Sequence, residues 1–327
     1  MSFGAIGTGI NSPTAALVGT MNAITEKYIY PVIADNVFQP SIMFWAMQRQ
    51  GKKFGMGELI YPAMYQENLA GGAYYGTELL TPTVVDTVQP IDQRWKPYYQ
   101  NVAIPVTDIV LNRNSALSII NTKWVEATGS ILMKLSRAMF HIAPQNTSQD
   151  VDDIDSWVFQ QNNVIGGIDR SQAANSWFKA QAPINAGSTA LTPAVANQGF
   201  GLTGQFGYDL PDILAMPVQS FYNFQNNFTQ LIRYTNNVQD DGAMQAGFRS
   251  HFIFNTALVF PDPFVPTGKS YLLNSKYIFP VWHKGDYFVC DPFIQPSNQR
   301  VLVSNLYVTW QVSCISPRMN DSYFNVN

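Results

Sequence analysis

The sequence predicts an α+β protein with mixed sheets and one dominant helix, and three stretches support this class. Residues 106–143 contain no proline and one glycine, and their apolar side chains recur at steps of three and four, as on one face of a helix. Residues 54–104 are β-branched and aromatic with interspersed prolines, and residues 252–317 form short apolar runs separated by proline and glycine. Both of these patterns are typical of strands.

The N-terminal region predicts an arm followed by two helices. Residues 1–11 are rich in glycine and lack periodicity. Ser12-Pro13 is a favourable helix start, with a serine cap and proline at the first helical position, and Pro31 ends this helix. A shorter helix is expected over residues 40–50.

Residues 54–104 predict one long β-hairpin, or finger. Its arms are GELIYPAMYQENL and TVVDTVQPIDQRWKPYYQNVAI, and the glycines of LAGGAYYGTELLTP mark a turn between them. Arms of about twelve residues at roughly 3.3 Å each would give a finger of about 40 Å. Because an isolated two-stranded ribbon is marginally stable in water, we expect the finger to lie on a neighbouring subunit.

The dominant helix is expected at about residues 115–142, capped by Asn114 or Ser115 and followed by Pro144. Roughly 28 residues at 1.5 Å each give a rod of about 42 Å. Its apolar stripe consists of Leu117, Ile120, Trp124, Ala127, Ile131, Leu135, Ala138 and Ile142.

The second half of the chain predicts mainly short strands. Residues 181–210 are expected to be a loop low in charge, LPDILAMP a buried strand and VQSFYNFQNNFTQLIRYT an amphipathic helix. Four strand-like runs follow: FIFNTALVFPDPF, SYLLNSKYIFPVW, DYFVCDPF and RVLVSNLYVTWQVSCISP.

The composition favours an assembly. Charged residues make up only 13% of the chain, about half the usual share, while aromatic residues also reach 13%, a balance closer to an interface than to a monomer surface. The net charge of −3, without a basic block, argues against a typical DNA-binding protein. Cys290 and Cys314 form no disulfide framework, which favours a reducing compartment. Neither a signal peptide nor an apolar run of about 20 residues is recognised.

The sequence predicts no catalytic, cofactor or metal site. Gly268-Lys269-Ser270 resembles the end of a phosphate-binding loop, but Pro263 occupies the position of its first glycine, so a surface turn is favoured. The histidines His141, His251 and His283 are isolated and are interpreted as packing or surface residues.

Four acidic residues could suggest a calcium loop: Asp150, Asp152, Asp153 and Asp155. A calcium loop of this length ends in a bidentate acid, and position 161 is glutamine. A solvated acidic loop is therefore the preferred interpretation, although a cation between subunits stays open.

Several segments, in order, resemble one group of tailed-phage major capsid proteins. The resemblance covers about residues 20–320, no single motif decides it, and it implies the Hong Kong 97-like fold. The segments are Asp35-Asn36-Val37-Phe38, Arg49-Gln50-Gly51-Lys52-Lys53-Phe54, Gly57-Glu58-Leu59-Ile60-Tyr61-Pro62, Gly166-Gly167-Ile168-Asp169-Arg170-Ser171 with Trp177, Pro211-Asp212-Ile213-Leu214, Phe260-Pro261-Asp262-Pro263 and Tyr271-Leu272-Leu273-Asn274-Ser275-Lys276-Tyr277.

The resemblance also implies a domain plan. It has an N-terminal arm with short helices (1–53), an extended E-loop (54–104), a P-domain with a spine helix at about 115–142 (105–164 and 301–327), and an A-domain (165–300). The length of 181–210 departs from the family pattern and puts A-domain details there in doubt. Some relatives cross-link a loop lysine to an asparagine, but none lies between Phe54 and Lys96, so non-covalent contacts are expected.

The implied function is a virion shell subunit, folded in the host cytoplasm, that forms hexamers and pentamers around double-stranded DNA. The implied partners are other copies, a portal protein, a separate scaffolding protein, decoration or cement proteins, and DNA through weak non-specific contact, without a membrane. Aromatic and arginine side chains dominate interface hot spots. The candidate intersubunit contacts are Tyr74, Tyr75 and Glu78 at the finger tip and Arg94, Trp95, Tyr98 and Tyr99 at its base.

Two other functions stay open. An encapsulin, a cellular nanocompartment shell, has the same fold and would differ by its protein cargo. A carbohydrate-binding or hydrolytic β-rich protein would use tyrosine and tryptophan to stack on sugars, but the sequence shows no recognisable pair of catalytic carboxylates.

Overall fold

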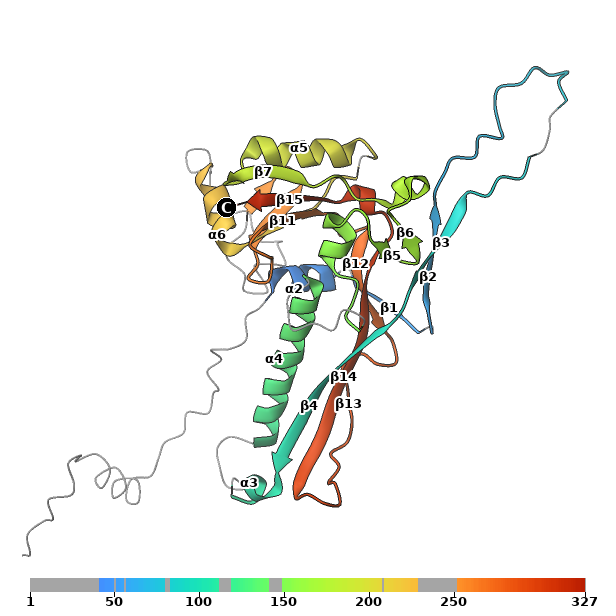
Figure 1. Cartoon of the computed structure of the whole chain (residues 1–327). Helices are drawn as coiled ribbons and strands as arrows, with labels where there is room; N and C mark the ends of the chain where they lie inside the picture. Colours follow the sequence, from blue (N-terminus) through green and yellow to red (C-terminus); the bar gives the residue numbers. More distant parts are fainter. Residues whose placement is uncertain are drawn as a thin grey trace, which may run out of the picture.

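The computed structural model describes residues 41–49, 51–55, 57–79, 83–111, 119–140, 149–207, 209–228 and 252–326. The expected N-terminal arm, the helix starting at Ser12, the caps Asn114 and Ser115, and His141 and His251 lie outside the described residues. The described chain forms two sheets, a long helix and an extended finger (Figure 1).

The first sheet has five strands and is built around β14 (Val301–Cys314). Its order is β1 (Lys52–Phe54), β12 (Ile278–His283), β14 and β13 (Val289–Cys290), with β4 (Lys96–Pro105) on the other side of β14. β4 and β14 pair antiparallel over ten residues, from Pro105↔Val301 to Lys96↔Trp310. This pairing makes the long ribbon that extends downward in Figure 1.

One face of this ribbon is covered by the long helix. α3 (Val106–Leu111) follows β4, and α4 (Ile119–Met139) runs back along the ribbon. Val102 and Ile104 are buried in one cluster with Ala127 of α4, because alternate residues of a strand point to the same face. The described part of the expected helix thus spans 21 residues, and its apolar stripe faces the sheet.

The second sheet has six strands and lies beyond the upper end of the ribbon. Its order is β7 (Ile184–Thr189), β15 (Asp321–Val326), β11 (Gly268–Leu273), β8 (Ile213–Met216), β10 (Ala257–Pro261) and β9 (Phe252–Phe254). The expected buried strand is β8, all four residues of which are buried. α5 (Pro193–Gly204) packs on β7 and β15, and α6 (Val218–Asn226) packs on β10.

A short helix connects the two sheets. α2 (Ile42–Gln48) packs on β12, with the Phe44 ring 6.0 Å from that of Trp282. The carboxylate of Asp262, which directly follows β10, accepts hydrogen bonds from the Ser41 hydroxyl at 2.7 Å and the Met43 backbone N–H at 2.9 Å. The first turn of α2 is therefore capped by a residue of the other sheet.

The finger is shorter in pairing than expected. β2 (Leu59–Met64) and β3 (Val88–Gln93) pair over six residues, and residues 65–79 and 83–87 connect them without further strands among those described. The second expected arm is divided at Arg94-Trp95, because β4 pairs with β14 instead of with the first arm. The tip is thus a loop on a short ribbon.

The expectation that residues 181–210 form a loop is wrong. They contain β7 and α5, and α5 begins with Thr192, whose hydroxyl accepts from Val195 N–H, followed by Pro193 at the first helical position. The glycines that suggested a loop serve packing instead. A Cβ on Gly199 would collide with the Tyr323 hydroxyl, which donates to the Ala196 carbonyl at 2.8 Å.

Smaller elements complete the fold. They are a π-helical turn η1 (Asp155–Phe159), the β5–β6 hairpin (Val164–Ile165 and Ile168–Asp169), and the 3-10 turns η2 (Ala173–Phe178) and η3 (Pro317–Met319). No helix among the described residues is long and apolar enough to span a membrane.

A buried carboxylate in the second sheet makes stability depend on pH. Asp321 lies on β15 under α5, and its Oδ2 has no hydrogen-bond partner among the described residues. Burial raises the pKa of Asp321 to about 7 from an ordinary value of 3.8. The folded state therefore binds a proton more tightly than the unfolded chain does, and this group favours folding at low pH.

We expect Asp321→Asn to flatten this dependence. In the wild type, the contribution of Asp321 is complete below about pH 4 and is lost as the pH rises through 7, with a difference of about 4 kcal/mol at ~1.4 kcal/mol per pKa unit. Urea unfolding at pH 4.5, 6 and 7.5 would measure it in both proteins. A free-energy difference between variant and wild type that stays constant with pH would contradict the prediction.

Candidate assembly surfaces

The finger is fixed to the body at its root by a buried polar network. The Gln93 side-chain amide donates to the Val312 carbonyl and to Asp152, both at 3.0 Å, and its oxygen accepts from the Ser313 hydroxyl. Asp152 also accepts from the Gln311 amide at 3.1 Å. Because these polar atoms are buried and partnered, the network specifies one direction for the finger.

A tight turn supports the same root from below. Gly166 adopts φ +60, and a Cβ at this position would meet the Ile91 side chain of β3. The Gly166 carbonyl accepts from Asp92 N–H at 2.9 Å. The close approach of the β5–β6 turn to β3 therefore requires a residue without a side chain.

Gly166→Ala should destabilise the subunit by about 2 kcal/mol, since it combines left-handed backbone strain with a clash. Gly167→Ala is the matched control, because Gly167 has φ +75 but its Cβ would come no closer than 3.6 Å to Asp92. Chemical unfolding of both variants measures the difference. Equal losses would show that the contact with Ile91 is unimportant.

The turn is held in turn by a buried arginine. Arg170 is fully buried, and its guanidinium donates to the Trp157 carbonyl at 2.8 Å, to the Ser156 and Gln160 carbonyls, and to the Asn163 side-chain oxygen. Burial lowers its pKa to about 10. The indole N–H of Trp157 then donates to the Val312 carbonyl at 3.0 Å, the same oxygen that binds Gln93.

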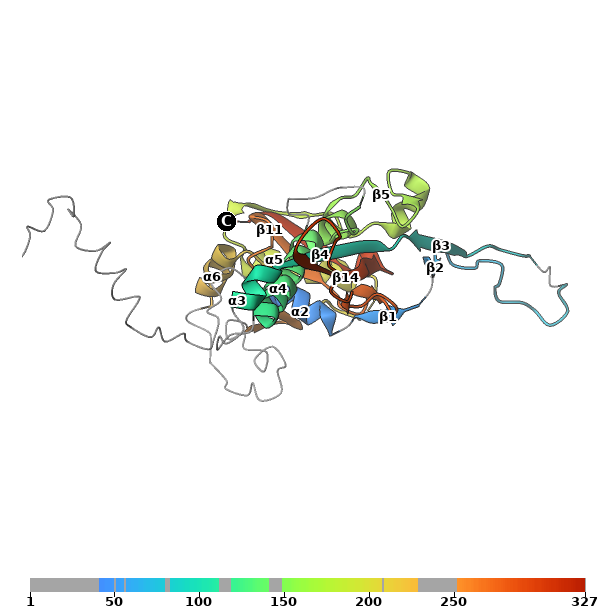
Figure 2. The same ribbon diagram turned by 90° about the horizontal axis from the view of Figure 1, so that it is seen from below.

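Beyond this root the finger is uncovered. Tyr75 is 77% exposed and Leu79 94% exposed, and Glu78 accepts a hydrogen bond from Tyr75 N–H. Figures 1 and 2 show the loop extending away from the body with no other described element beside it. Exposed apolar side chains on such a projection indicate an interaction surface.

The structure divides the seven candidate contact residues into two groups. The exposed group is Tyr74, Tyr75, Glu78, Arg94 and Tyr99. The other two side chains pack within their own subunit, with the Trp95 ring 5.1 Å from that of His283 and the Tyr98 ring 6.1 Å from that of Trp310. The Tyr98 hydroxyl also donates to Asp150 at 2.8 Å, and burial raises its pKa well above the ordinary value.

A groove of about 470 Å³ lies at the finger root and is lined by Arg94, Trp95, Lys96, Pro97, Tyr98, Tyr99, Gln149 and Tyr307. It borders the face of the β4–β14 ribbon that α4 does not cover. On that face Tyr99 pairs with Tyr307 across the strands, and Tyr99 is 63% exposed. Nothing in the described chain covers these aromatic side chains.

The interpretation of residues 150–155 as a solvated acidic loop is wrong. Asp153 and Asp155 are buried, and burial raises the pKa of Asp152. Asp155 accepts from Lys269 at 2.6 Å and from the Tyr271 hydroxyl at 2.7 Å. The acids face inward because β11 and the finger root supply their donors. No group of metal-binding side chains occurs among the described residues.

The other singled-out residues have structural positions. Gly268-Lys269-Ser270 begins strand β11, with Gly268 at φ +82, so it is the start of a strand and not a loop before a helix. His283 ends β12 beside Trp95. Cys290 is exposed and Cys314 is buried, and both are free.

Comparisons with known proteins identify the fold. No protein-family model and no curated protein matches the sequence. Among solved structures, the capsid of cyanophage A-1(L) is similar with a TM-score of 0.67 at 11% identity, covering 94% of this chain and 99% of that chain. The capsid of a native GTA particle gives 0.62 at 9%, covering 97% and 100%.

A shell protein of another kind is also similar. The holo-SrpI encapsulin complex from Synechococcus elongatus gives a TM-score of 0.58 at 11% identity, covering 95% of both chains. The agreement extends over nearly the whole length in each case, and the predicted α+β class is confirmed. The arrangement of finger, long helix and two sheets in this chain is therefore the Hong Kong 97-like fold.

Proposed function

We propose that this chain is the major capsid protein of a tailed phage, which assembles into hexamers and pentamers of a head that encloses double-stranded DNA. The observation that carries this proposal is the uncovered finger. Its root is fixed by buried hydrogen bonds, whereas its tip exposes Tyr74, Tyr75 and Leu79. A rigidly directed apolar projection gains stability from a second surface.

The domain roles follow the sheets. The finger would serve as E-loop, the β4–β14 ribbon with α4 as P-domain and spine, and the six-stranded sheet with α5 and α6 as A-domain. This assignment moves β15 from the P-domain to the A-domain, and β12 and β13 from the A-domain to the P-domain, relative to contiguous segments, because the pairing follows the sheets.

The mechanism is assembly through many modest contacts. The fingertip, the uncovered ribbon face and the groove lie on different sides of one subunit, so each copy can contact several neighbours. Together such contacts can exceed the roughly 1,600 Å² of a standard interface, and closure of a ring converts weak contacts into a stable shell. The proposal places the protein in the virion, without catalytic activity, with a portal, a scaffolding protein, decoration proteins and DNA as further partners.

Particle formation tests the proposal. The purified full-length chain, with and without a crowding agent, should give capsomer rings or closed particles by negative-stain microscopy and fast-sedimenting species in the ultracentrifuge. A monodisperse, folded monomer under all these conditions, with the finger tucked against its own body, would contradict it.

An encapsulin is the second candidate, favoured by the similarity to the encapsulin complex. Particles recovered from the native host separate the two. Nuclease-protected double-stranded DNA inside them supports the capsid, and a co-purifying enclosed protein supports the encapsulin. The carbohydrate-binding alternative gains no support from the fold.

A further inference from the structure

The finger carries charge of one sign only. Between Phe54 and Gln93 the sequence contains five acidic residues and no lysine, arginine or histidine. The acids are Glu58, Glu67, Glu78, Asp86 and Asp92. Since the whole chain has a net charge of −3, the rest of the chain is net positive. A surface that receives the finger must offset this charge or repel it.

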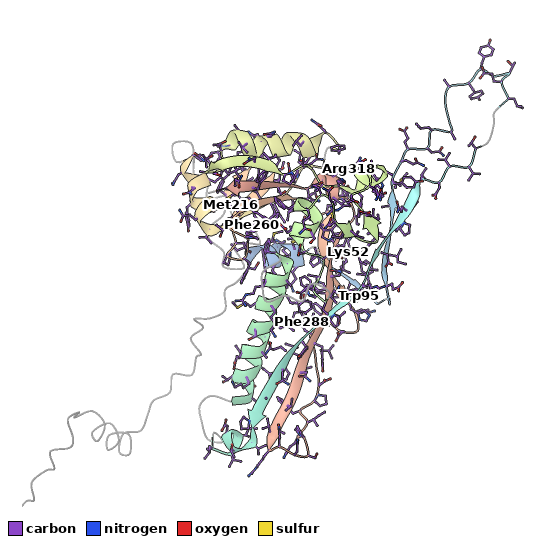
Figure 3. All side chains as sticks on the ribbon, in the orientation of Figure 1. Lys52, Trp95, Met216, Phe260, Phe288 and Arg318 are labelled. Carbon is purple, nitrogen blue, oxygen red and sulfur yellow. The ribbon has the colours of Figure 1, made fainter. Side chains whose placement is uncertain are left out.

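Four cationic side chains gather at the opposite end of the finger, and we call Lys52, Lys53, Arg94 and Lys284 the basic collar. All four are exposed. Lys284 N–H donates to the Phe54 carbonyl at 2.7 Å, which places it beside Lys53. His283 contacts Trp95, the residue after Arg94, and Figure 3 shows Lys52 and Trp95 near the root of the finger.

The collar is held in position but not neutralised. The Lys52 ammonium lies 4.0 Å from the centre of the Phe279 ring, and that of Lys53 lies 3.6 Å from the centre of the Tyr287 ring. The ion pairs found among the described residues involve Lys123, Lys269 and Lys276 instead. Arg94 also lines the aromatic groove, so charge and apolar surface adjoin there.

The tip has the matching chemistry. Tyr74 and Tyr75 are exposed beside Glu78, and Glu67 is exposed on the other arm of the loop. Because the finger points away from its own root (Figure 1), its tip and its collar lie at opposite ends of one projection. A contact between them therefore joins two copies.

From this arrangement we propose that the acidic, aromatic fingertip of one copy docks on the basic collar and adjoining groove of a second copy. The inference rests on the proposed function and names the partner surface of the finger. Tip-to-root docking is a heterologous contact, which propagates in one direction and closes into a ring. Its charged part should weaken as salt shortens the screening length.

A charge-reversal exchange tests the docking. One variant carries Arg94→Glu and Lys284→Glu, and a second carries Glu67→Lys and Glu78→Lys. Each alone presents tip and collar of the same sign, and at least a tenfold loss of assembled material is expected at low salt. An equimolar mixture should recover assembly, because each tip then meets an oppositely charged collar on the other variant.

The controls separate this inference from the proposed function. Lys134→Glu with Arg300→Glu makes the same charge change at exposed residues away from the collar and should leave assembly near the wild-type level. Circular dichroism and the unfolding midpoint of free subunits check folding. If a reversed variant misfolds, Arg94→Gln with Lys284→Gln replaces it, and the salt sensitivity of assembly should decrease.

Three results are decisive. Wild-type-like assembly of the collar variant, or a folded mixture that does not recover, would overturn the docking while leaving the shell function intact. Failure of the wild type to assemble under every condition would instead overturn the proposed function. Recovery in the mixture alone supports the docking.

Discussion

Arg170→Ala is expected to lower the free energy of unfolding by about 3–5 kcal/mol, the largest stability effect of any single substitution considered for this chain. The guanidinium supplies donors to the Trp157, Ser156 and Gln160 carbonyls and to the Asn163 oxygen. All of these acceptors surround a side chain with no exposed surface. Removing the arginine leaves several buried acceptors without donors, and each such loss carries a desolvation cost.

Urea unfolding of free subunits measures this effect, and Arg170→Lys provides the graded comparison. Lysine keeps the charge but cannot place donors in the planar fork that reaches carbonyls on both sides, so an intermediate loss is expected. Arg318→Ala serves as a control, because Arg318 is half-buried and stacks on Phe206 with its guanidinium carbon 5.3 Å from the ring centre. Similar midpoints for Arg170→Ala and the wild type would show that the cage does not stabilise the fold.

Replacing residues 66–86 by an Asn-Gly turn should abolish shell assembly while leaving the subunit folded. Tyr65 N–H donates to the Thr87 carbonyl at 3.0 Å, so this pair can be closed by a two-residue turn. The truncation keeps the six-residue β2–β3 ladder and the contact of Tyr65 with Trp177. It removes only the loop that carries the exposed tip.

Sedimentation velocity and negative-stain microscopy would measure the loss, and the unfolding midpoint would confirm that the body is intact. A milder variant, with Tyr74, Tyr75 and Leu79 each replaced by serine, keeps the loop length and should weaken assembly in part. Normal particles from the truncated chain would remove the finger from any account of assembly.

Local patterns were sufficient where neighbours in sequence are also neighbours in space. The apolar stripe of α4 repeats every three or four residues, and the buried strand β8 is a short apolar run, so both could be predicted without tertiary information. The exposed tip could be predicted for the same reason, because a long ribbon rich in aromatic residues cannot bury them within itself. The fold class followed from these elements.

Glycine and charge misled where long-range contacts decided the outcome. The glycines of α5 suggested a loop, but Gly199 makes room for Tyr323, a residue of the last strand. The aspartates after α4 suggested a solvated loop, but Asp155 is partnered by Lys269 and Tyr271 from β11. No local property distinguishes a buried aspartate from an exposed one when its donors are more than 100 residues away.

The same limit applies to the finger root. Arg94, Trp95, Tyr98 and Tyr99 were expected to act as one group at the base of a hairpin, yet the chain changes sheets between β3 and β4. Trp95 and Tyr98 turn inward as a result, while Arg94 and Tyr99 stay exposed. Gln93 gave no signal in the sequence, because an isolated glutamine has no pattern, and its partners Val312 and Ser313 lie about 220 residues away.

The sequence by itself determined the long helix, the projecting finger and the uneven distribution of charge, since these depend on periodicity, composition and order along one stretch of chain. The tertiary structure decided where the finger is fixed, which of its aromatic residues remain available and where the cations gather around its root. The physical reason is that burial and hydrogen-bond satisfaction depend on partners that pairing brings together across the sheets. Those partners are set by the register of β4 and β12 on β14, which no short stretch of sequence specifies.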